Sequence, residues 1–197
     1  MATRANKSIS AFKSALVGGG ARPNLFEVEL TTLPGGISWD ADSFRYMCKA
    51  AQLPASVIAN IDVPFRGRIF KVAGDRTIET WSVTVINDED FKIRNAFEQW
   101  MQLIAKLDTN IGATNPDAYM VDAEVFQLGR GGKSGKESKT NTGTNSAILK
   151  QYKMEGIFPT NLAGIDLSYD TGDTIEEFTV EFQVQSFTPF DGSGPNL

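Results

Sequence analysis

The polarity pattern between Thr77 and Leu107 changes from a period of two residues to a helical period within a few positions. In its first part, β-branched and apolar residues alternate as in a strand, with Trp81 on the side expected to be buried. Asn87 and Asp88 are favourable N-cap residues followed by acidic residues, so we expect a helix to begin there. Its apolar positions form one stripe that would lie on a sheet: Ile93, Phe97, Trp100, Ile104 and Leu107.

Other segments also alternate between apolar and polar residues, which predicts further strands. They cover residues 25–31, 44–50, 119–126, 148–154 and 174–187. In the second of these segments Cys48 lies on the apolar side, so we expect a small buried hydrophobic residue rather than a reactive thiol. Several strands and a single amphipathic helix together indicate an α+β domain with mainly β structure.

The segment from Ala55 to Val72 is too apolar for a loop that faces solvent. Pro and Gly residues punctuate it, which is typical of a hairpin. We expect this hairpin either to fold back on its own sheet or to carry an apolar surface to a neighbouring molecule. Arg66 and Arg68 beside Phe65 would suit a phosphate in isolation, but two arginines in an acidic chain are weak support for such a site.

The chain is expected to comprise three parts: an N-terminal arm at residues 1–23, a single domain at residues 24–190 and a flexible C-terminal tail at residues 191–197. In the arm, Ile9 and Phe12 belong to an apolar cluster with the spacing of a short helix. Such a helix would either dock on a partner or pack on its own domain. Within the domain, residues 129–146 are rich in Gly, Ser, Thr and Lys, which predicts a mobile polar loop.

Composition limits the classes of function open to the chain. A length of 197 residues with 41% hydrophobic residues suits one domain with one core. There is no apolar run of about 18 residues and no apolar segment of the signal-peptide type, so neither membrane insertion nor Sec export is expected. With no histidine and a single cysteine, zinc sites and histidine-based catalysis lose their usual groups. A net charge of −5 disfavours binding to nucleic acid.

Two motifs that suggest chemistry fail on their spacing. The Gly-Lys-Ser run at residues 132–134 lacks the upstream glycine of a phosphate-binding loop, because that position is Gln127. The acidic run at residues 88–90 lacks a third oxygen ligand for calcium, because Lys92 stands in its place. The remaining carboxylates are explained by a helix start or by polar strand faces, so we predict no catalytic, metal-binding or cofactor-binding residue.

Three stretches in a fixed order carry a specific resemblance. They read CKAAQLPAS from Cys48, VPFRGRIFKVAGDRTIETWSVTVINDEDFKIRNAFEQWM from Val63, and GIFPTNLAGIDLSYDTGDTIEEFTVEFQVQSF from Gly156. Together they resemble the tail tube proteins of contractile-tailed bacteriophages, which are related to the tube proteins of type VI secretion. The resemblance covers most of the chain, from about Asn24 to Phe190.

This resemblance implies an antiparallel β-barrel or sandwich flanked by one amphipathic helix, and a structural role with neither catalysis nor cofactors. Six copies would form a ring, and rings would stack into the inner tube of a contractile tail, the conduit for DNA ejection. The implied partners are further copies of the chain and the sheath, baseplate and tail terminator proteins. The tape measure protein and genomic DNA would pass through the lumen without specific binding. The implied location is the virion, after assembly in the cytoplasm of the host bacterium.

Two sets of surface residues are candidates for this assembly. Contacts between stacked rings are expected at Ile58, Ile61, Val63, Pro64, Phe65, Arg66, Arg68, Ile9 and Phe12. The lumen is expected to be lined by acidic residues from polar strand faces, which would repel DNA phosphates: Glu27, Glu29, Asp122, Glu124, Glu177 and Glu181. Packing between the helix and the core is expected at Trp81, Ile93, Phe97, Trp100 and Ile104.

Two alternatives stay open. In the first, the chain is a monomeric ligand-binding β-barrel in which Trp39, Trp81 and Trp100 line a cavity, although tryptophans in a core need no ligand to explain them. In the second, the chain is a related tube-like component, such as a tube cap, a baseplate tube protein or a secretion-system tube. Its length and single-domain build favour the main repeating subunit.

Overall fold

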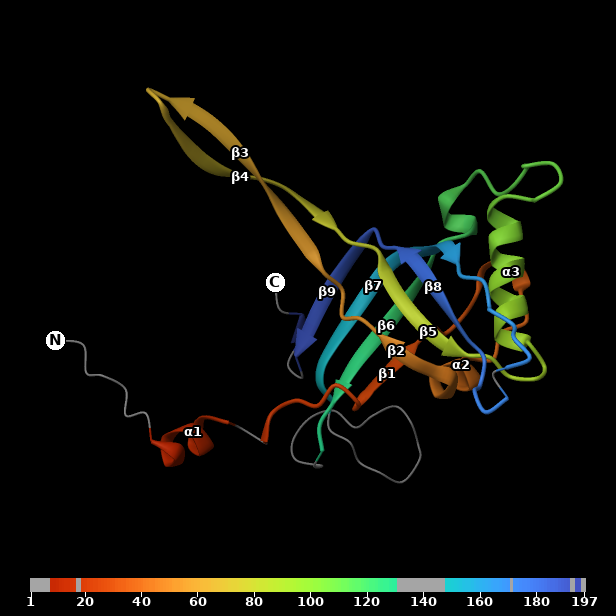
Figure 1. The fold of residues 1–197 in the computed structure, drawn as a ribbon. Coiled ribbons are helices and arrows are strands. Elements are labelled where there is room, and N and C mark those ends of the chain that lie inside the picture. Colours follow the sequence, from red (N-terminus) through yellow and green to blue (C-terminus); the bar gives the residue numbers. More distant parts are fainter. Residues whose placement is uncertain (1–7, 17–18, 131–147, 171, 192–193, 196–197) are drawn as a thin grey trace.

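A computed structural model describes residues 8–16, 19–130, 148–170, 172–191 and 194–195. Most strands form one curved antiparallel sheet in the order β1-β6-β7-β8-β5-β2, with β9 paired to β7 and β10 paired to β9 (Figure 1). The strands of this sheet are β1 (Phe26–Glu29), β2 (Cys48–Ala51), β5 (Trp81–Ile86), β6 (Val121–Leu128), β7 (Ile148–Leu162), β8 (Glu177–Gln183), β9 (Ser186–Asp191) and β10 (Gly194–Pro195). Two further strands, β3 (Ser56–Phe65) and β4 (Arg68–Ile78), form a separate ribbon. The predicted α+β domain with mainly β structure is confirmed.

The sheet does not close into a barrel. Its path begins at β1 and ends at β2, and no ladder joins these two strands within the described residues. Both edge strands have only four residues, and the short helix α2 (Ala41–Met47) packs against both of them. The closed-barrel form of the prediction is therefore wrong, because a helix occupies the seam where the last ladder would form. Two short 3-10 turns complete the domain, η2 (Pro34–Gly36) and η3 (Pro116–Ala118).

Strand β7 is the longest element and connects the two parts of the sheet. Its first part pairs with β6 and β9, and its last part, from Phe158 onward, pairs with β8. Gly156 lies at this change of partner with φ 64°, a left-handed conformation that glycine adopts without a steric penalty. The strand predicted at residues 174–187 is divided at the same level into β8 and β9. The other predicted strands at residues 25–31, 119–126 and 148–154 match β1, β6 and β7.

Helix α3 (Lys92–Ile104) closes the core over the sheet. The ring of Phe97 is fully buried, and its centroid lies 5.5 Å from that of Trp39 and 5.9 Å from that of Phe182. Trp100 is also fully buried, and its indole N–H donates to the carbonyl of Tyr119 at 2.7 Å. This aromatic cluster joins the helix to the inner face of β8, so the helix and the sheet share one hydrophobic core.

The predicted start and end of this helix are wrong. The backbone N–H of Asn87 donates to the carbonyl of Glu176 at 2.9 Å, and its side-chain amide donates to the carboxylate of the same residue at 3.0 Å. Asn87 therefore prolongs the contact between β5 and the segment before β8 instead of capping a helix. The helix begins at Lys92, after Phe91 in a left-handed conformation with φ 53°. Leu107 lies beyond its end and is 90% exposed.

The strand predicted at residues 44–50 is also wrong, because most of it forms helix α2. The carboxylate of Asp40 caps this helix by accepting the backbone N–H of Ser43 at 3.1 Å. Phe44 and Cys48 are both buried, as residues four positions apart on a helix often are, and this spacing also fits a strand. The expected burial of Cys48 is confirmed, and that burial raises the pKa of its thiol to about 12.

The terminal parts are described only in pieces. The N-terminal arm contains helix α1 (Ile9–Ala15). The predicted polar loop at residues 129–146 lies outside the described residues except for positions 129 and 130. In the predicted flexible tail, Asp191 ends β9, and β10 pairs back on that strand. None of the described helices has the length and apolar character needed to cross a membrane.

Candidate assembly surfaces

The ribbon of β3 and β4 projects away from the body of the protein, and we call residues 56–78 the β-arm (Figure 1). Its register runs from Ser56 opposite Ile78 to Phe65 opposite Arg68. Arg66 and Gly67 connect the strands with φ values of 46° and 80°. Two positive values are the signature of a two-residue type I′ turn, whose twist matches that of the strands. With ten residues, β3 extends for about 33 Å.

The two faces of the β-arm differ in polarity. In an antiparallel ladder, directly paired residues share a face and successive residues alternate between faces. The apolar arm face carries the pairs Ile61 with Val72 and Val63 with Phe70, and Phe65 near the tip. The opposite face carries the pairs Asn60 with Ala73, Asp62 with Lys71 and Pro64 with Ile69.

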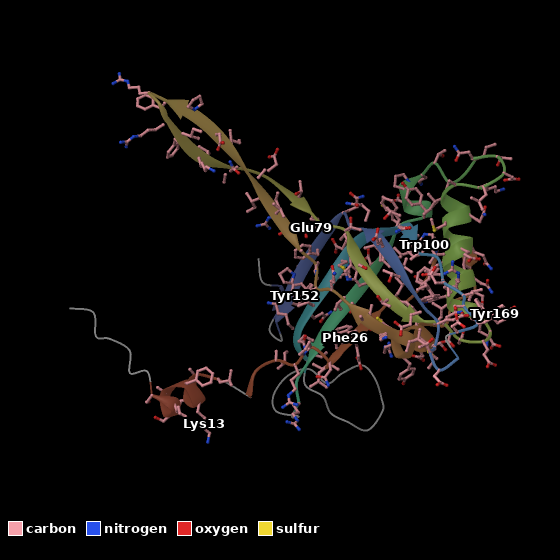
Figure 2. All side chains as sticks on the ribbon, viewed as in Figure 1. Lys13, Phe26, Glu79, Trp100, Tyr152 and Tyr169 are labelled. Carbon is pink, nitrogen blue, oxygen red and sulfur yellow. The ribbon has the colours of Figure 1, made fainter. Side chains whose placement is uncertain are left out.

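The β-arm does not fold back on its own sheet. Every residue of β3 is exposed, and Phe65 and Phe70 retain 66% and 67% of their surface. Figure 2 shows Glu79 at the base of the arm and the side chains of the tip extended away from the domain. Of the two alternatives for this hairpin, the structure therefore supports an apolar surface offered to another molecule.

The β-arm carries all of the hairpin residues that were predicted to make contacts between rings: Ile58, Ile61, Val63, Pro64, Phe65, Arg66 and Arg68. The guanidinium of Arg66 lies 5.4 Å from the centre of the Phe65 ring. The candidate set missed Phe70 and Val72 on β4, which complete the apolar arm face. Their alternation on the far side of the Arg66-Gly67 turn was the signal that could have identified them.

Helix α1 carries the other two predicted contact residues. The hydroxyl of Ser8 caps it by accepting the backbone N–H of Ala11 at 3.2 Å. Ile9 and Phe12 are 87% and 68% exposed, and no residue of this helix is buried. Figure 1 shows the helix apart from the sheet. In the described part of the chain, the alternative that this segment packs on its own domain is therefore wrong.

The six acidic residues predicted to line a lumen lie on the outward face of the sheet. Each belongs to a strand in which it alternates with buried core residues, so the register places it on the face opposite the core. Glu27, Glu29, Asp122 and Glu124 lie close together on β1 and β6, and Glu177 and Glu181 lie on β8. We call this set the acidic sheet face.

Basic and amide groups relieve part of the repulsion on this face. Glu29 and Glu124 are directly opposite each other in the ladder, which is unfavourable for two like charges. The guanidinium of Arg45 lies 3.8 Å from the carboxylate of Glu29. The amide of Gln151 donates to the carboxylate of Glu124 at 3.0 Å.

Two lysines also belong to the acidic sheet face, and the sequence analysis missed both. Lys153 lies 3.1 Å from the carboxylates of Asp122 and Glu155, and the hydrogen bond with Asp122 raises the pKa of this lysine. Lys49 forms an ion pair with Glu177. The alternation of Lys153 with apolar residues along β7 was the signal that places it on this face.

The tryptophans that a ligand-binding barrel would use are packed into the core instead. Trp81 and Trp100 are 2% and 0% exposed, and Trp39 lies 5.1 Å from Phe44 between ring centres. The indole N–H of Trp39 donates to Leu30 at 2.6 Å, and that of Trp81 donates to the carbonyl of Gln52 at 2.8 Å. The other predicted packing residues also lie in or against this core: Ile93, Phe97 and Ile104.

In the run of acidic residues before α3, Asp90 pairs with the first residue of that helix. Asp90 lies 2.5 Å from Lys92, and a hydrogen bond from this lysine lowers the pKa of Asp90. Among the described residues, no group of three or more His, Cys, Asp or Glu side chains is arranged to hold a metal ion.

Comparison with known proteins gives these surfaces a context. The family model described as phage tail tube protein matches residues 21–189. This chain belongs to the phage tail tube protein family. A relative within the tail tube family is tail tube protein gp19 of Enterobacteria phage T4. It is 35% identical over 160 residues, which cover 81% of this chain and 86% of the relative.

Solved structures with the tail tube fold come from contractile injection systems. A chain in the baseplate of the anti-feeding prophage has a TM-score of 0.60 at 9% identity, with 88% of this chain and 97% of that chain covered. A chain in the sheath–tube complex of the PVC extracellular contractile injection system has a TM-score of 0.54 at 12% identity, with 94% and 99% covered. At these identities the similarity shows the fold alone.

Proposed function

We propose that this chain is the structural subunit of the inner tube of a contractile phage tail, and that it catalyses no reaction. Rings of six copies stack into a hollow tube, through which the genome leaves the virion. The observation that carries this proposal is an apolar β-arm, without a covering layer of its own, on a chain that is 35% identical to a phage tail tube protein.

The energetics of the β-arm support self-assembly. A ribbon of two strands is only marginally stable in water, because nothing covers its apolar side chains. Phe65 and Phe70 are about two-thirds exposed in the isolated subunit. Covering each of them in a neighbouring subunit contributes about 1–2 kcal/mol to assembly. A tube repeats this contact in every subunit, so modest single contacts add up to a stable polymer.

We further propose that the acidic sheet face lines the lumen. DNA phosphates near this wall would meet like charge within the screening length of about 8 Å at physiological salt. Lys49 and Lys153 reduce the negative charge on this face but leave acidic side chains in excess. Weak repulsion without a binding site would allow DNA to slide instead of sticking.

The proposed partners are the tail sheath around the tube and the baseplate and terminator proteins at its ends. The tape measure protein and then the DNA occupy the lumen. Assembly takes place in the host cytoplasm. The presence of the same fold in a sheath–tube complex and in a baseplate supports these classes of partner. It also keeps a cap or baseplate tube protein as the second candidate, although 35% identity to gp19 favours the repeating subunit.

Negative-stain electron microscopy of the purified chain over a range of concentrations tests the proposal. A repeating tube subunit should form long hollow tubes with six-fold symmetry in end views. A cap or baseplate protein should stop at single rings or short stacks. A chain that stays monomeric at every concentration would contradict the proposal and would favour the ligand-binding alternative.

The lumen assignment needs a separate experiment in assembled phage. Glu181→Lys is the preferred substitution, because reversal of Glu177 would also place two lysines side by side at Lys49. It should leave tubes intact but slow DNA ejection in a salt-dependent way. Glu89→Lys, which reverses an exposed charge outside the sheet, is the control. Equal ejection rates for both variants would remove Glu181 from the lumen wall.

A further inference from the structure

The loop between β7 and β8 forms a second exposed surface with apolar and charged character. We define the acidic end loop as residues 164–170 and 172–176. Its large apolar side chains are exposed: Leu167 at 79%, Tyr169 at 108% and Ile175 at 71%. The segment from 164 to 176 contains four acidic residues and no basic residue. An open hollow of about 620 Å³ is lined by residues 164–169 and 174–177.

The acidic carboxylates of this loop are available to a partner. Among the described residues, no ion pair engages Asp166, Asp170 or Asp173, and all three are exposed. Exposed apolar side chains among unpaired charges of one sign are typical of a surface that meets a partner of opposite charge.

The tip of the β-arm has the complementary chemistry. Between Val63 and Lys71 it carries Arg66, Arg68 and Lys71 and no acidic residue. Phe65 and Phe70 lie among these positive charges, and each is at least 66% exposed. The tip is therefore basic and apolar although the whole chain has a net charge of −5.

The two surfaces lie on opposite sides of the molecule. Figure 2 shows Tyr169 beside the start of α3, at the side of the domain away from the β-arm. In Figure 1 the sheet stands between the acidic end loop and the arm tip. The arm cannot reach the loop of its own subunit, so a contact between the two surfaces requires a second copy.

We infer that the tip of the β-arm docks in the acidic end loop of a subunit in the adjacent ring. This contact rests on the proposed function and specifies which surface receives the arm. Because the arm tip and the loop are different patches, the contact is heterologous, and a heterologous contact builds rings or open stacks instead of a closed dimer. Phe65 and Phe70 lie against Tyr169 and its apolar neighbours, while the arginines face the aspartates.

The contact also gives tube growth a direction and a salt dependence. Opposite charges steer the incoming tip toward the loop and align it before the apolar groups meet. The screening length shortens from about 10 Å at 0.1 M to about 3 Å at 1 M ionic strength. Growth should therefore slow with added salt more than the finished tube is weakened, because the docked aromatic side chains are not screened.

Paired charge reversals test the contact. The arm variant is Arg66→Glu with Arg68→Glu, and the loop variant is Asp170→Lys with Asp173→Lys. Sedimentation gives the concentration above which tubes form. Each double variant should raise this concentration at least tenfold, and the chain that carries all four substitutions should return to within threefold of the wild type. The control is Asp108→Lys with Asp117→Lys, which reverses two exposed charges in another loop and should have no effect.

The outcomes separate this contact from the proposed function. Thermal unfolding of each variant should match the wild type, because all four positions are exposed. Two results would overturn the docking site alone. The first is a loop variant that forms tubes at the wild-type concentration. The second is an arm variant whose defect is not restored in the chain with all four substitutions. In that case the arm would bind elsewhere, for example at the apolar groove between α3 and β7 beside Ile104 and Phe158. A wild-type chain that forms no tubes would contradict both the contact and the proposed function.

Discussion

Truncation of one aromatic side chain on the apolar arm face should weaken tube assembly without changing the fold of the subunit. Phe70 is 67% exposed and pairs with Val63 on this face. Full burial of such a side chain contributes about 1.5–3 kcal/mol. Two-thirds of that value, about 1–2 kcal/mol, is the free energy that assembly would lose in Phe70→Ala.

The expected effect on assembly follows from this free energy. A loss of about 1–2 kcal/mol changes an equilibrium constant by about five- to thirtyfold. The concentration above which Phe70→Ala forms tubes should rise by this factor. If whole rings add to the tube, the rise should be larger, because each ring then loses the contact several times. Sedimentation of tubes over a dilution series measures this concentration directly.

Ile69→Ala is a closely matched control for Phe70→Ala. Ile69 is the preceding residue, is 63% exposed and lies on the opposite face of the same ribbon, opposite Pro64. It should change the concentration for tube formation by less than about threefold, the size of effect expected for a surface substitution within about 0.5 kcal/mol. Both variants should unfold at the wild-type temperature. Equal effects of the two substitutions, or normal assembly of Phe70→Ala, would refute the assignment of the apolar arm face as a contact.

Three predictions concern the stability of the subunit. Phe97→Ala removes the centre of the aromatic cluster and should lower the free energy of unfolding in urea by about 3–5 kcal/mol. Gly156→Ala places a Cβ 2.9 Å from Gln185 at a left-handed φ of 64°, so its thermal midpoint should fall, with a loss of about 1–2 kcal/mol. The hydroxyl and backbone N–H of Ser43 hold the pKa of Asp40 below its ordinary value of 3.8. Because the ionised carboxylate of Asp40 is favoured in the folded state, it stabilises the fold above pH 3.8, and this stabilisation is lost as the pH falls through the lower, folded-state pKa. Asp40→Asn should therefore flatten that part of a curve of stability against pH.

The comparison between sequence and structure shows where periodicity is informative. The stripe of α3 extends over thirteen residues, long enough for one period to dominate, and Phe97 and Trp100 are buried as that period requires. The strand period holds in β5, where Trp81 is buried, but the strand predicted from Thr77 is divided between β4 and β5. Helix α2 has only seven residues, and Phe44 and Cys48 are spaced so that a strand and a helix both place them inside. Over so short a segment the N-cap at Asp40 selects the helix. This cap could not be recognised from the sequence, because an aspartate can form several other local hydrogen bonds with the backbone.

The start of α3 was predicted wrongly for a reason of tertiary structure. Asn87 and Asp88 have good intrinsic N-cap preference, but Glu176 from a distant part of the chain accepts two hydrogen bonds from Asn87. The two bonds keep this residue in line with β5, and the chain then needs a further turn through Phe91 before the helix begins. No local pattern contains the position of Glu176, so this boundary could not be predicted from local propensity.

The assembly surfaces follow a different logic from the core. A buried face can be predicted from one sequence because other residues of the same subunit cover it. The acidic sheet face can be predicted from the same alternation, since it is the opposite face of the same strands. Among the described residues of its own chain, the apolar arm face has no complement. Its excess of apolar residues therefore fitted two interpretations, packing on its own sheet or contact with a neighbouring molecule. Only the observation that Phe65 and Phe70 remain exposed directs them outward. The exposed apolar residues of the β-arm therefore point to a contact with a second molecule. Among the described surfaces, the acidic end loop best complements the arm tip, because its aromatic, aliphatic and charged groups are exposed.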